Sequence, residues 1–433
     1  MFNVDLLGFG SPFCVLVDKT ERISLFLIKI STMFKWLVFF LLLVMGACSS
    51  SHRTSKQANL LAHKYIIADG HVDLPYRLKV KNFRFQKEYV GIPLSSKEGD
   101  FDFVRAKKGG LSAPFMSIYI PAHLSPAEGR LLSDSLIQMV KGIAAAHPSH
   151  FAIARSPQDV NTSFAIGLVS LPMGMENGSP ISTLADLKYF KNQGISYITL
   201  THSKSNAICD SSYDTLRPWT GLSPFGFEVV REMNRLGIMI DVSHISDSSF
   251  WDVMHTTKVP VIASHSSARK FTPGFERNMS DDLIRAMKTN GGVIMVNFGS
   301  DFVDGNVTST NKNNETIIAE VLKRKNIPAD SEQGRAWIER FRKQNPRLYA
   351  DVEKVADHID HIVSLAGIDH VGFGSDFDGV GDSLPNGLKD VSDYPNLIAS
   401  LLRRGYTENE IEKICYKNLF RVWEEVLTYN DGK

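Results

Sequence analysis

The chain has 433 residues, of which 43% are hydrophobic and 22% are charged, with a formal net charge of +1 at pH 7. These values are typical of a globular protein with enough apolar residues for a large core. A charge balance this close to neutral argues against nucleic acid as the main partner, because phosphate binding requires a basic surface. At this length, one barrel with insertions competes with two or three smaller domains.

Residues 1–50 have the pattern of an export signal rather than that of a folded core. Lys35 precedes an apolar run at residues 37–45, which is followed by small residues and Cys48. A cation, a short apolar stretch and small residues are typical of a secretion signal, and the run is too short to span a membrane. The segment resembles a bacterial lipoprotein signal, in which Cys48 is acylated and becomes the mature N-terminus.

The lipoprotein resemblance implies an exported protein, anchored at the membrane through lipidated Cys48 and facing the periplasm or the cell surface. An uncleaved N-terminal anchor is the alternative, and it also places the body of the chain outside the cytoplasm. The residues before Met33 carry several charges, so we interpret them as an extension upstream of a start codon at Met33 rather than at Met1. We expect residues 51–61 to form a linker.

The four cysteines are divided between the leader and the body. Cys14 and Cys48 fall in the leader, and Cys209 and Cys415 fall in the body. One possible pair is no disulfide framework for a chain of this size. We expect both body cysteines to be buried as small apolar residues.

Eight short apolar runs alternate with helical patterns along the body of the chain. The runs lie at residues 65–73, 114–120, 164–171, 195–202, 238–244, 259–265, 293–298 and 370–376. Each has the length and the Val, Ile and Leu content of a strand that is buried on both faces. Repeated strand and helix units predict a parallel α/β sheet, and eight of them favour a closed (β/α)8 barrel of the TIM type over a doubly wound open sheet.

Capping residues and glycine stops mark the helices between these runs. Ser223 and Gly237 bound one helical pattern, and Ser280 and Gly291 bound another. Helices are expected at residues 131–146, 183–193, 227–236, 247–257, 281–290, 352–366, 396–404 and 408–427. The last two follow the eighth run and are expected to close the barrel.

Residues 300–349 form the longest interruption of the strand and helix pattern, between the seventh and the eighth run. They contain helical patterns at residues 315–325 and 331–343. We therefore expect a helical insertion at this place, and a lid over the site is one interpretation of it.

Residues able to bind metal or to move protons stand at the ends of six of the eight runs. They are His71, Asp73, Glu176, His202, His244, His265 and Asp376. Because barrel enzymes build their sites from the C-terminal ends of the strands, we expect these side chains to converge on one mouth. A single histidine is more often structural than a ligand, and we interpret the histidines of helices and loops, including His358 and His361, in that way.

The first two of these residues have the spacing of a metal site. His71 and Asp73 are two positions apart on a strand, so both side chains project from one face and can hold one ion. Three histidines and two carboxylates suit zinc or a similar divalent ion, and they exceed the ligands of one tetrahedral site. We therefore favour two zinc ions that share Glu176, with His244 and His265 on the second ion. A hydroxide held between such ions is nucleophilic at neutral pH.

Several short motifs together resemble one known family. Residues 68–75, Ala-Asp-Gly-His-Val-Asp-Leu-Pro, resemble the opening motif of the membrane (renal-type) dipeptidases, which are amidohydrolase-like zinc metallopeptidases. Further matches follow in the family's order at residues 174–178, 200–202, 241–244, 264–268, 277–278 and 374–379. On this resemblance we expect residues 62–427 to form one metal-dependent hydrolase barrel.

The family resemblance implies a binuclear zinc enzyme that hydrolyses dipeptides, including those with a C-terminal D-residue, by a metal-bridging hydroxide. The implied metal ligands are His71, Asp73, Glu176, His244 and His265, with Glu176 as the bridge. The dipeptide and the membrane are then the expected partners, with no role for nucleic acid, and a homodimer is compatible with the sequence.

The resemblance also implies roles for three residues that contact the substrate. Asp376 matches the acid that activates the bridging water and passes its proton to the leaving amine. His202 matches the residue that stabilises the oxyanion, and Arg277 matches the arginine that binds the terminal carboxylate, for which a guanidinium fork is well suited. Residues 298–302 depart from the family, because they contain no tyrosine where family members can carry aromatic hydroxyls, so the side-chain preference is expected to differ.

Two other functions are compatible with these motifs. A binuclear amidohydrolase could act on another small amide, a lactone or a phosphotriester, although the carboxylate-binding role of Arg277 argues against this. A catalytically silent barrel would act as a surface binding protein, but the chain has every implied ligand and the implied acid. For Arg277 itself, a surface salt bridge is the structural alternative.

Overall fold

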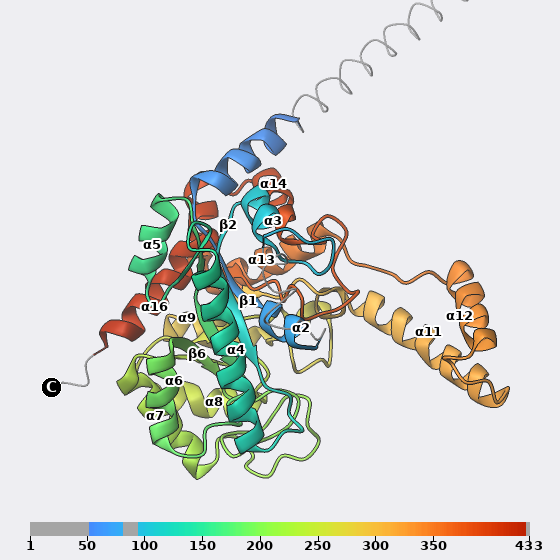
Figure 1. Cartoon of the computed structure of the whole chain (residues 1–433), viewed down its shortest axis with the longest axis horizontal. Coiled ribbons are helices and arrows are strands. Elements are labelled where there is room, and N and C mark those ends of the chain that lie inside the picture. The colour runs from blue at the N-terminus through green and yellow to red at the C-terminus, as the bar shows by residue number, and fades with distance from the viewer. Residues whose placement is uncertain (1–51, 81–93, 430–433) are drawn as a thin grey trace, which may run out of the picture. The chain divides into compact units, whose positions relative to one another are not determined.

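The computed structural model describes residues 52–80 and 94–429 (Figure 1). The chain divides into two compact units, Met1–Lys56 and Gln57–Lys433, and the second contains the barrel. The expected leader, with Cys48 and both candidate start positions, lies outside the described residues. Within the described ranges, no helix is both long enough and apolar enough to cross a membrane.

Eight parallel strands close into a barrel, as the sequence predicts. Around the barrel they follow chain order, with β10 paired to β1 at the closure. They are β1 (Ile67–Val72), β2 (Leu111–Tyr119), β5 (Met173–Glu176), β6 (Ile195–Thr199), β7 (Met239–Asp241), β8 (Ile262–Ala263), β9 (Val293–Val296) and β10 (Val371–Phe373). Nearly every residue of these strands is buried, because side chains fill the barrel on one face and helices cover the other.

The predicted third strand, residues 164–171, is wrong. Its first residues end α5 (Pro157–Ala165), and its last form β4 (Val169–Leu171), which pairs with β3 (Phe151–Ile153) outside the barrel. Pro172 separates β4 from the barrel strand β5, because proline has no N–H group to continue the strand's hydrogen bonding. The carbonyl oxygen of Pro172 accepts a hydrogen bond from Met116 N. Glu176 is therefore the last residue of a barrel strand and does not follow the strand at a distance.

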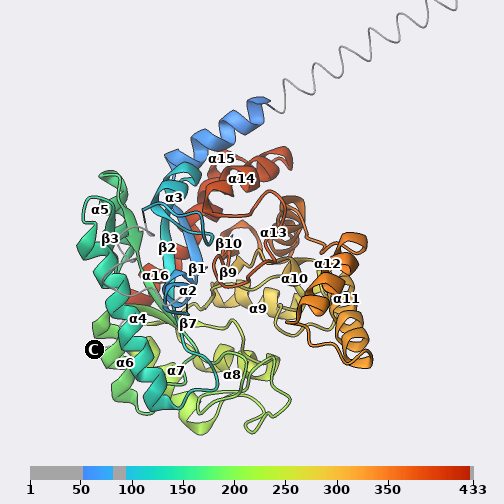
Figure 2. The same cartoon turned by 45° about the vertical axis from the view of Figure 1, so that its right-hand side comes forward.

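Helices follow the strands around the barrel in both views (Figures 1 and 2). They include α2 (Leu74–Val80), α3 (Phe103–Gly109), α4 (Pro126–Ala146), α6 (Leu184–Gln193), α7 (Pro224–Leu236), α8 (Asp247–Thr256), α9 (Asp281–Asn290), α13 (Val352–Ala366), α14 (Tyr394–Arg403), α15 (Glu408–Glu412) and α16 (Asn418–Thr428). The predicted caps are confirmed. Ser223 and Ser280 accept hydrogen bonds from the backbone at the starts of α7 and α9, and left-handed Gly237 and Gly291 end these helices.

The predicted insertion contains three helices between β9 and α13. They are α10 (Ser300–Val303), α11 (Gly305–Arg324) and α12 (Glu332–Gln344). Both views show α11 and α12 side by side and standing out from the barrel (Figures 1 and 2). In contrast, α10 is held at the barrel mouth, where Ser300 N donates to Ser383 O at 2.7 Å and Ala350 N donates to Ser300 Oγ at 3.0 Å.

Cys209 and Cys415 are buried and unpaired, as expected. Residues 57–64, which overlap the expected linker, are helical, and Ala58, Leu61 and Ala62 of this segment are buried.

A buried carboxylate joins the first and last barrel strands beneath the mouth. Asp69 Oδ1 accepts hydrogen bonds from His71 N at 2.9 Å and from Ser375 N at 3.0 Å, and Tyr394 donates its hydroxyl to the other oxygen. Burial raises the pKa of Asp69, and these donors oppose the rise. Asp69 thereby fixes the backbone on which His71 and Asp376 stand.

One glycine of the barrel is required by close packing, and this gives a test of the fold. An added Cβ at Gly174 would lie 1.9 Å from the ring of Tyr197, which is fully buried. We expect Gly174→Ala to lower the free energy of unfolding by about 1–3 kcal/mol through overpacking. The measurement is denaturant unfolding followed by circular dichroism.

Gly372→Ala is the matched control for this substitution. Gly372 also lies in a barrel strand, but its added Cβ would be 3.2 Å from the flexible side chain of Met295. The control is expected to be much milder. Equal stability of the Gly174 variant and the native chain would contradict the packing described here.

Candidate active site

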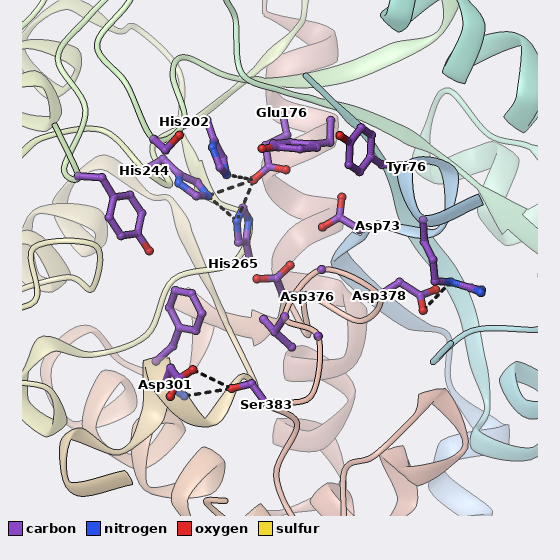
Figure 3. Close-up of a pocket in the computed structure, with 18 of the residues that line it drawn as sticks. Asp73, Tyr76, Glu176, His202, His244, His265, Asp301, Asp376, Asp378 and Ser383 are labelled. Atoms are coloured by element: carbon purple, nitrogen blue, oxygen red, sulfur yellow. Dashed lines mark hydrogen bonds and ion pairs between the residues drawn. The ribbon is translucent and has the colours of Figure 1, made fainter. Parts of the chain in front are cut away.

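A cavity of about 550 Å³ opens at the C-terminal ends of the barrel strands (Figure 3). Its wall contains Asp73, Glu176, His202, His244, His265 and Asp376. His71 lies beneath these residues, fully buried, and its imidazole is grouped with Glu176 and His265 and also with Asp73 and Asp376. All seven strand-end residues singled out in the sequence therefore meet in one place.

Glu176 lies at the centre of this cluster. Its Oε1 is 3.0 Å from His244 Nε2, 3.4 Å from His265 Nε2 and 3.6 Å from His202 Nε2. Its other oxygen, Oε2, is 3.4 Å from His71 Nε2. The three histidines at Oε1 surround Glu176 in Figure 3. One carboxylate therefore has imidazoles at both of its oxygens, which is the arrangement that a bridging ligand between two ions requires.

Hydrogen bonds away from the cavity set the orientation of two imidazoles. The hydroxyl of Tyr197 donates its one hydrogen to Gly70 O. Its oxygen therefore accepts the hydrogen bond from His71 Nδ1, at 2.9 Å. His71 Nε2 is then the nitrogen that points into the cluster, and it can bind a cation once its proton is displaced. A partner on the far nitrogen is the usual way in which proteins fix the tautomer of a metal-binding histidine.

His265 is held by a longer chain of the same kind. Ser264 Oγ donates to Asp241 Oδ2 at 2.6 Å and therefore accepts from His265 Nδ1 at 2.7 Å. Asp241 is fully buried, and its other oxygen accepts from the backbone N–H groups of Ser243 and Ser264. The Asp241–Ser264–His265 chain thus directs His265 Nε2 at Glu176.

Two site residues have left-handed backbone conformations. His244 has a φ of 70° and Asp376 has a φ of 63°, values that residues other than glycine rarely adopt. Each is held by a backbone hydrogen bond: Ser212 N donates to His244 O at 2.8 Å, and Asp376 N donates to His71 O at 3.1 Å. Strained conformations of this kind are common at functional sites.

The electrostatics of the cluster favour a bound cation. Burial opposes the charge on Glu176, but the imidazoles of His71 and His202 hold its pKa well below the usual range. Burial lowers the pKa of His244 and of His265 well below the usual value, and nearby Arg277 adds to this effect. An ionised carboxylate and neutral imidazoles are the protonation states in which these groups bind metal.

The pKa of His71 reflects the excess of negative charge in the cluster. Burial alone would lower its pKa, but Tyr197, Glu176 and Asp73 hold the pKa well above the usual value. His71 Nε2 and Asp73 Oδ1 are also buried atoms without a hydrogen-bond partner. Buried polar atoms of this kind normally have a partner, and a divalent ion would supply one to both.

Asp376 stands at the edge of the cluster with a partner that the sequence analysis missed. Asn297 Nδ2 donates to Asp376 Oδ2 at 2.8 Å, and an added Cβ at Gly379 would lie 2.2 Å from both Asp376 Oδ1 and Asp73 Oδ2. Burial raises the pKa of Asp376 to about 7, and the carboxylates of Asp73 and Glu176 act in the same direction. An acid with this pKa can both accept and release a proton near neutral pH.

His202 is part of the cavity wall, whereas Arg277 is buried outside it. His202 lines the cavity, with its ring 4.2 Å from the ring of His244, and burial lowers its pKa. Arg277 is only 3% exposed and is not in the described cavity wall, so the surface salt bridge is excluded. Its guanidinium donates to Ser266 Oγ at 2.7 Å and to His265 O at 2.8 Å, and its Nε has no partner.

Further wall residues were not named individually as site residues in the sequence analysis. They are Tyr76, Arg77, Val80, Tyr119, Ser203, Tyr213, Asp301, Phe302, Asp378, Gly379, Val380, Gly381 and Ser383. Asp301 and Phe302 belong to α10, and neither α11 nor α12, both of them fully described, contributes to the wall. Among the three helices of the insertion, α10 is therefore the one that lines the cavity.

The histidines interpreted as structural include two with clear structural partners. His358 Nδ1 accepts from Ala268 N at 2.9 Å, and its Nε2 is 3.0 Å from Val303 O. His361 Nε2 is 2.7 Å from Asp281 Oδ1 on the neighbouring helix. Neither lines the cavity.

A buried cluster of imidazoles and carboxylates at the mouth of a parallel barrel defines a metal-dependent hydrolase. Residues 55–433 match the family model described as membrane dipeptidase (peptidase family M19). The chain belongs to this family, and it is a metallo-dipeptidase.

Individual relatives agree with this assignment. An uncharacterized dipeptidase of Schizosaccharomyces pombe is 34% identical over 381 residues, which are 83% of this chain and 80% of the relative. The probable dipeptidase PvdM from Pseudomonas aeruginosa has a TM-score of 0.73 at 26% identity, covering 87% of this chain and 99% of that one. A metallopeptidase from Rhodobacter sphaeroides, liganded with a phosphinate mimic of L-Ala-D-Ala, shares the fold with a TM-score of 0.69 at 24% identity, over 84% and 99% of the two chains.

The Asp241–Ser264–His265 chain predicts the effect of a small substitution on metal affinity. Ser264→Ala leaves His265 Nδ1 and Asp241 Oδ2 without their shared partner. We expect the affinity for divalent metal to fall by about 10- to 100-fold, as with other supporting partners of metal ligands. Competition with a chromogenic chelator measures this.

Ser267→Ala is the control for this substitution, because Ser267 is equally buried but donates to Asn297 O instead of to an imidazole. Its metal affinity is expected to stay close to that of the native chain. If the Ser264 and Ser267 variants bound metal equally well, the positioning role of Ser264 would be refuted.

Proposed function

We propose that this protein is a zinc-dependent dipeptidase that hydrolyses both L,L-dipeptides and dipeptides with a C-terminal D-residue. The observation that carries the proposal is the Glu176 carboxylate, which lies within 3.6 Å of four imidazole nitrogens. These histidines stand in β1 or just after β6, β7 and β8. Imidazole and carboxylate donors in this proportion suit zinc. In the proposal, His71 and Asp73 hold one ion, His244 and His265 hold the other, and Glu176 is shared.

Bound zinc ions would polarise the scissile carbonyl and lower the pKa of water, while side chains of the chain move the protons. We assign the proton transfer to Asp376. Its carboxyl faces the cluster, its pKa near 7 suits both acceptance and release, and Asn297 fixes its orientation. Asp376 would take a proton from the attacking water and give it to the departing amine.

His202 and Arg277 are assigned to substrate binding. His202 lines the cavity with its Nε2 3.6 Å from Glu176 Oε1, and burial lowers its pKa. We assign its Nε2–H as a donor to the oxyanion of the tetrahedral intermediate. Arg277 is assigned to the terminal carboxylate. Its guanidinium lies 3.0 Å from His244 Nε2 and has an Nε without a partner. Binding of the terminal carboxylate so close to the cluster would restrict the substrate to very short peptides.

We also propose that the protein is exported and anchored at a membrane surface through acylated Cys48. Support comes from the cation, the short apolar run and the small residues that precede Cys48 in the sequence. An extracytoplasmic site would give the enzyme access to small peptides outside the cell.

The role of Asp376 is tested by its isosteric amide. We expect Asp376→Asn to bind zinc with native stoichiometry but to lose nearly all turnover of L-Ala-L-Ala and L-Ala-D-Ala, because an amide cannot accept the proton. Zinc content by atomic spectroscopy and amine release by a ninhydrin assay provide the two measurements.

Asp382→Asn serves as the control, since Asp382 is on the same loop but contacts Tyr349 outside the cavity. Substantial turnover by zinc-loaded Asp376→Asn would disprove the assignment. A substrate panel with a lactone and a phosphotriester distinguishes the dipeptidase from the other amidohydrolase activities.

Acylation is tested in a bacterial host that is fed a radiolabelled fatty acid. The native chain is expected to take up label and to fractionate with membranes, whereas Cys48→Ala takes up none and is released or retains its leader. Labelling of the Cys48 variant at the native level would contradict the proposed anchor, and Cys209→Ala is the control for loss of an unrelated cysteine.

A further inference from the structure

We infer that Asp301 selects dipeptides whose C-terminal residue has a cationic side chain, such as lysine, ornithine or arginine. The inference rests on the proposed function and concerns the wall of the same cavity. Asp301 stands in α10, directly after β9, at a place where the sequence departs from the family resemblance.

The carboxylate of Asp301 is fixed but remains accessible. Ser383 Oγ donates to Asp301 Oδ2 at 3.2 Å, and Asp301 N is 3.4 Å from Ser383 Oγ. Ser383 is itself buried, while the Asp301 side chain is 39% exposed. Figure 3 shows the two residues together, on the far side of Asp376 from the histidine and glutamate cluster.

Among the residues that the structure describes, the charges of the cavity wall leave Asp301 without a full counter-ion. Outside the metal cluster, the other Asp, Glu, Lys and Arg side chains of the described wall are Arg77 and Asp378, whose Nε and Oδ1 are 2.8 Å apart and therefore form a pair of their own. Arg347 forms an ion pair with Asp301, with its Nη2 3.8 Å from Oδ2, and its side chain is 35% exposed. An exposed pair at this distance contributes little, so Asp301 presents negative charge to the cavity.

An apolar surface leads from the proposed carboxylate site to Asp301. The Phe302 ring lies 5.5 Å from the Arg277 guanidinium, and Phe302 and Val380 both line the cavity. Gly299 makes room for this pair, because an added Cβ there would lie 2.9 Å from Val380 and 3.0 Å from Phe302. A side chain with an aliphatic stem and a cationic end matches this wall, with its stem on Phe302 and its charge at Asp301.

This path fixes the position of the cationic residue in the substrate. Arg277 is assigned to the terminal carboxylate, and Phe302 is next to it, so the side chain that reaches Asp301 belongs to the C-terminal residue. Along the wall formed by Tyr76, Arg77 and Val80, the described residues offer no comparable carboxylate for a cation, because Asp378 is already paired with Arg77.

The experiment compares three dipeptides with the zinc-loaded full chain. They are L-Ala-L-Lys, L-Ala-L-norleucine, which has a stem of similar length without the charge, and L-Ala-L-Glu. We expect kcat/KM for the lysine substrate to exceed that for the norleucine substrate by about tenfold, which corresponds to about 1.4 kcal/mol, and the glutamate substrate to be the poorest. In Asp301→Asn, the ratio of the lysine to the norleucine value is expected to fall to about one.

The variant Arg347→Gln tests whether Asp301 recognises the substrate or only holds Arg347 in place. If Asp301 recognises the substrate, removal of a competing cation raises the preference for lysine over norleucine by a few-fold. If Asp301 serves only to hold Arg347, the preference is the same in both variants and in the native chain, and the inference is overturned. Asp382→Asn is the matched control with an unchanged preference, and thermal unfolding of each variant checks that it is folded.

The outcomes also separate the inference from the function on which it rests. Hydrolysis of all three dipeptides at similar kcat/KM keeps the proposed function and refutes the selectivity. A lack of hydrolysis of every dipeptide by the zinc-loaded native chain refutes both.

Discussion

The structure of this site depends on one buried carboxylate, Glu176, and on the groups that compensate its charge. A carboxylate that is 3% exposed is costly unless it is paired. Here four imidazoles approach it from β1, β6, β7 and β8, each from the C-terminal end of its strand or from the residues that follow. The closed barrel makes this possible, because it brings the ends of all eight strands to one mouth.

The surrounding structure gives these imidazoles their orientation. Tyr197 holds His71, and the Asp241–Ser264 pair holds His265, while Asp69 ties β1 to the loop that carries Asp376. The left-handed backbone of His244 and Asp376 is strained, and the stable barrel beneath them supports that strain. The same scaffold leaves α10 and the loop after β10 to form the outer wall, to which we assign selectivity among substrates.

Much of this was predictable from the sequence, because two strong signals coincide. Apolar runs of strand length gave the barrel, and metal-binding residues at their ends gave the cluster. The third strand was misplaced because residues 164–171 are as apolar as a barrel strand, and only pairing shows that Pro172 separates β4 from β5. Asn297, Tyr197 and Ser264 were missed because neutral polar residues within apolar runs carry no signal until their partners are known. The depth of Arg277 and the exposure of Asp301 likewise depend on contacts distant in sequence.

The most direct test of the account is the metal stoichiometry of the purified chain and of Glu176→Gln, measured by atomic spectroscopy after dialysis against limiting zinc. An amide keeps the size of the side chain but removes the negative charge that two bound cations would share. The account predicts two zinc ions per native chain and at most one in the variant. Two tightly held ions in Glu176→Gln, or fewer than two in the native chain at saturating zinc, would contradict the shared-carboxylate centre.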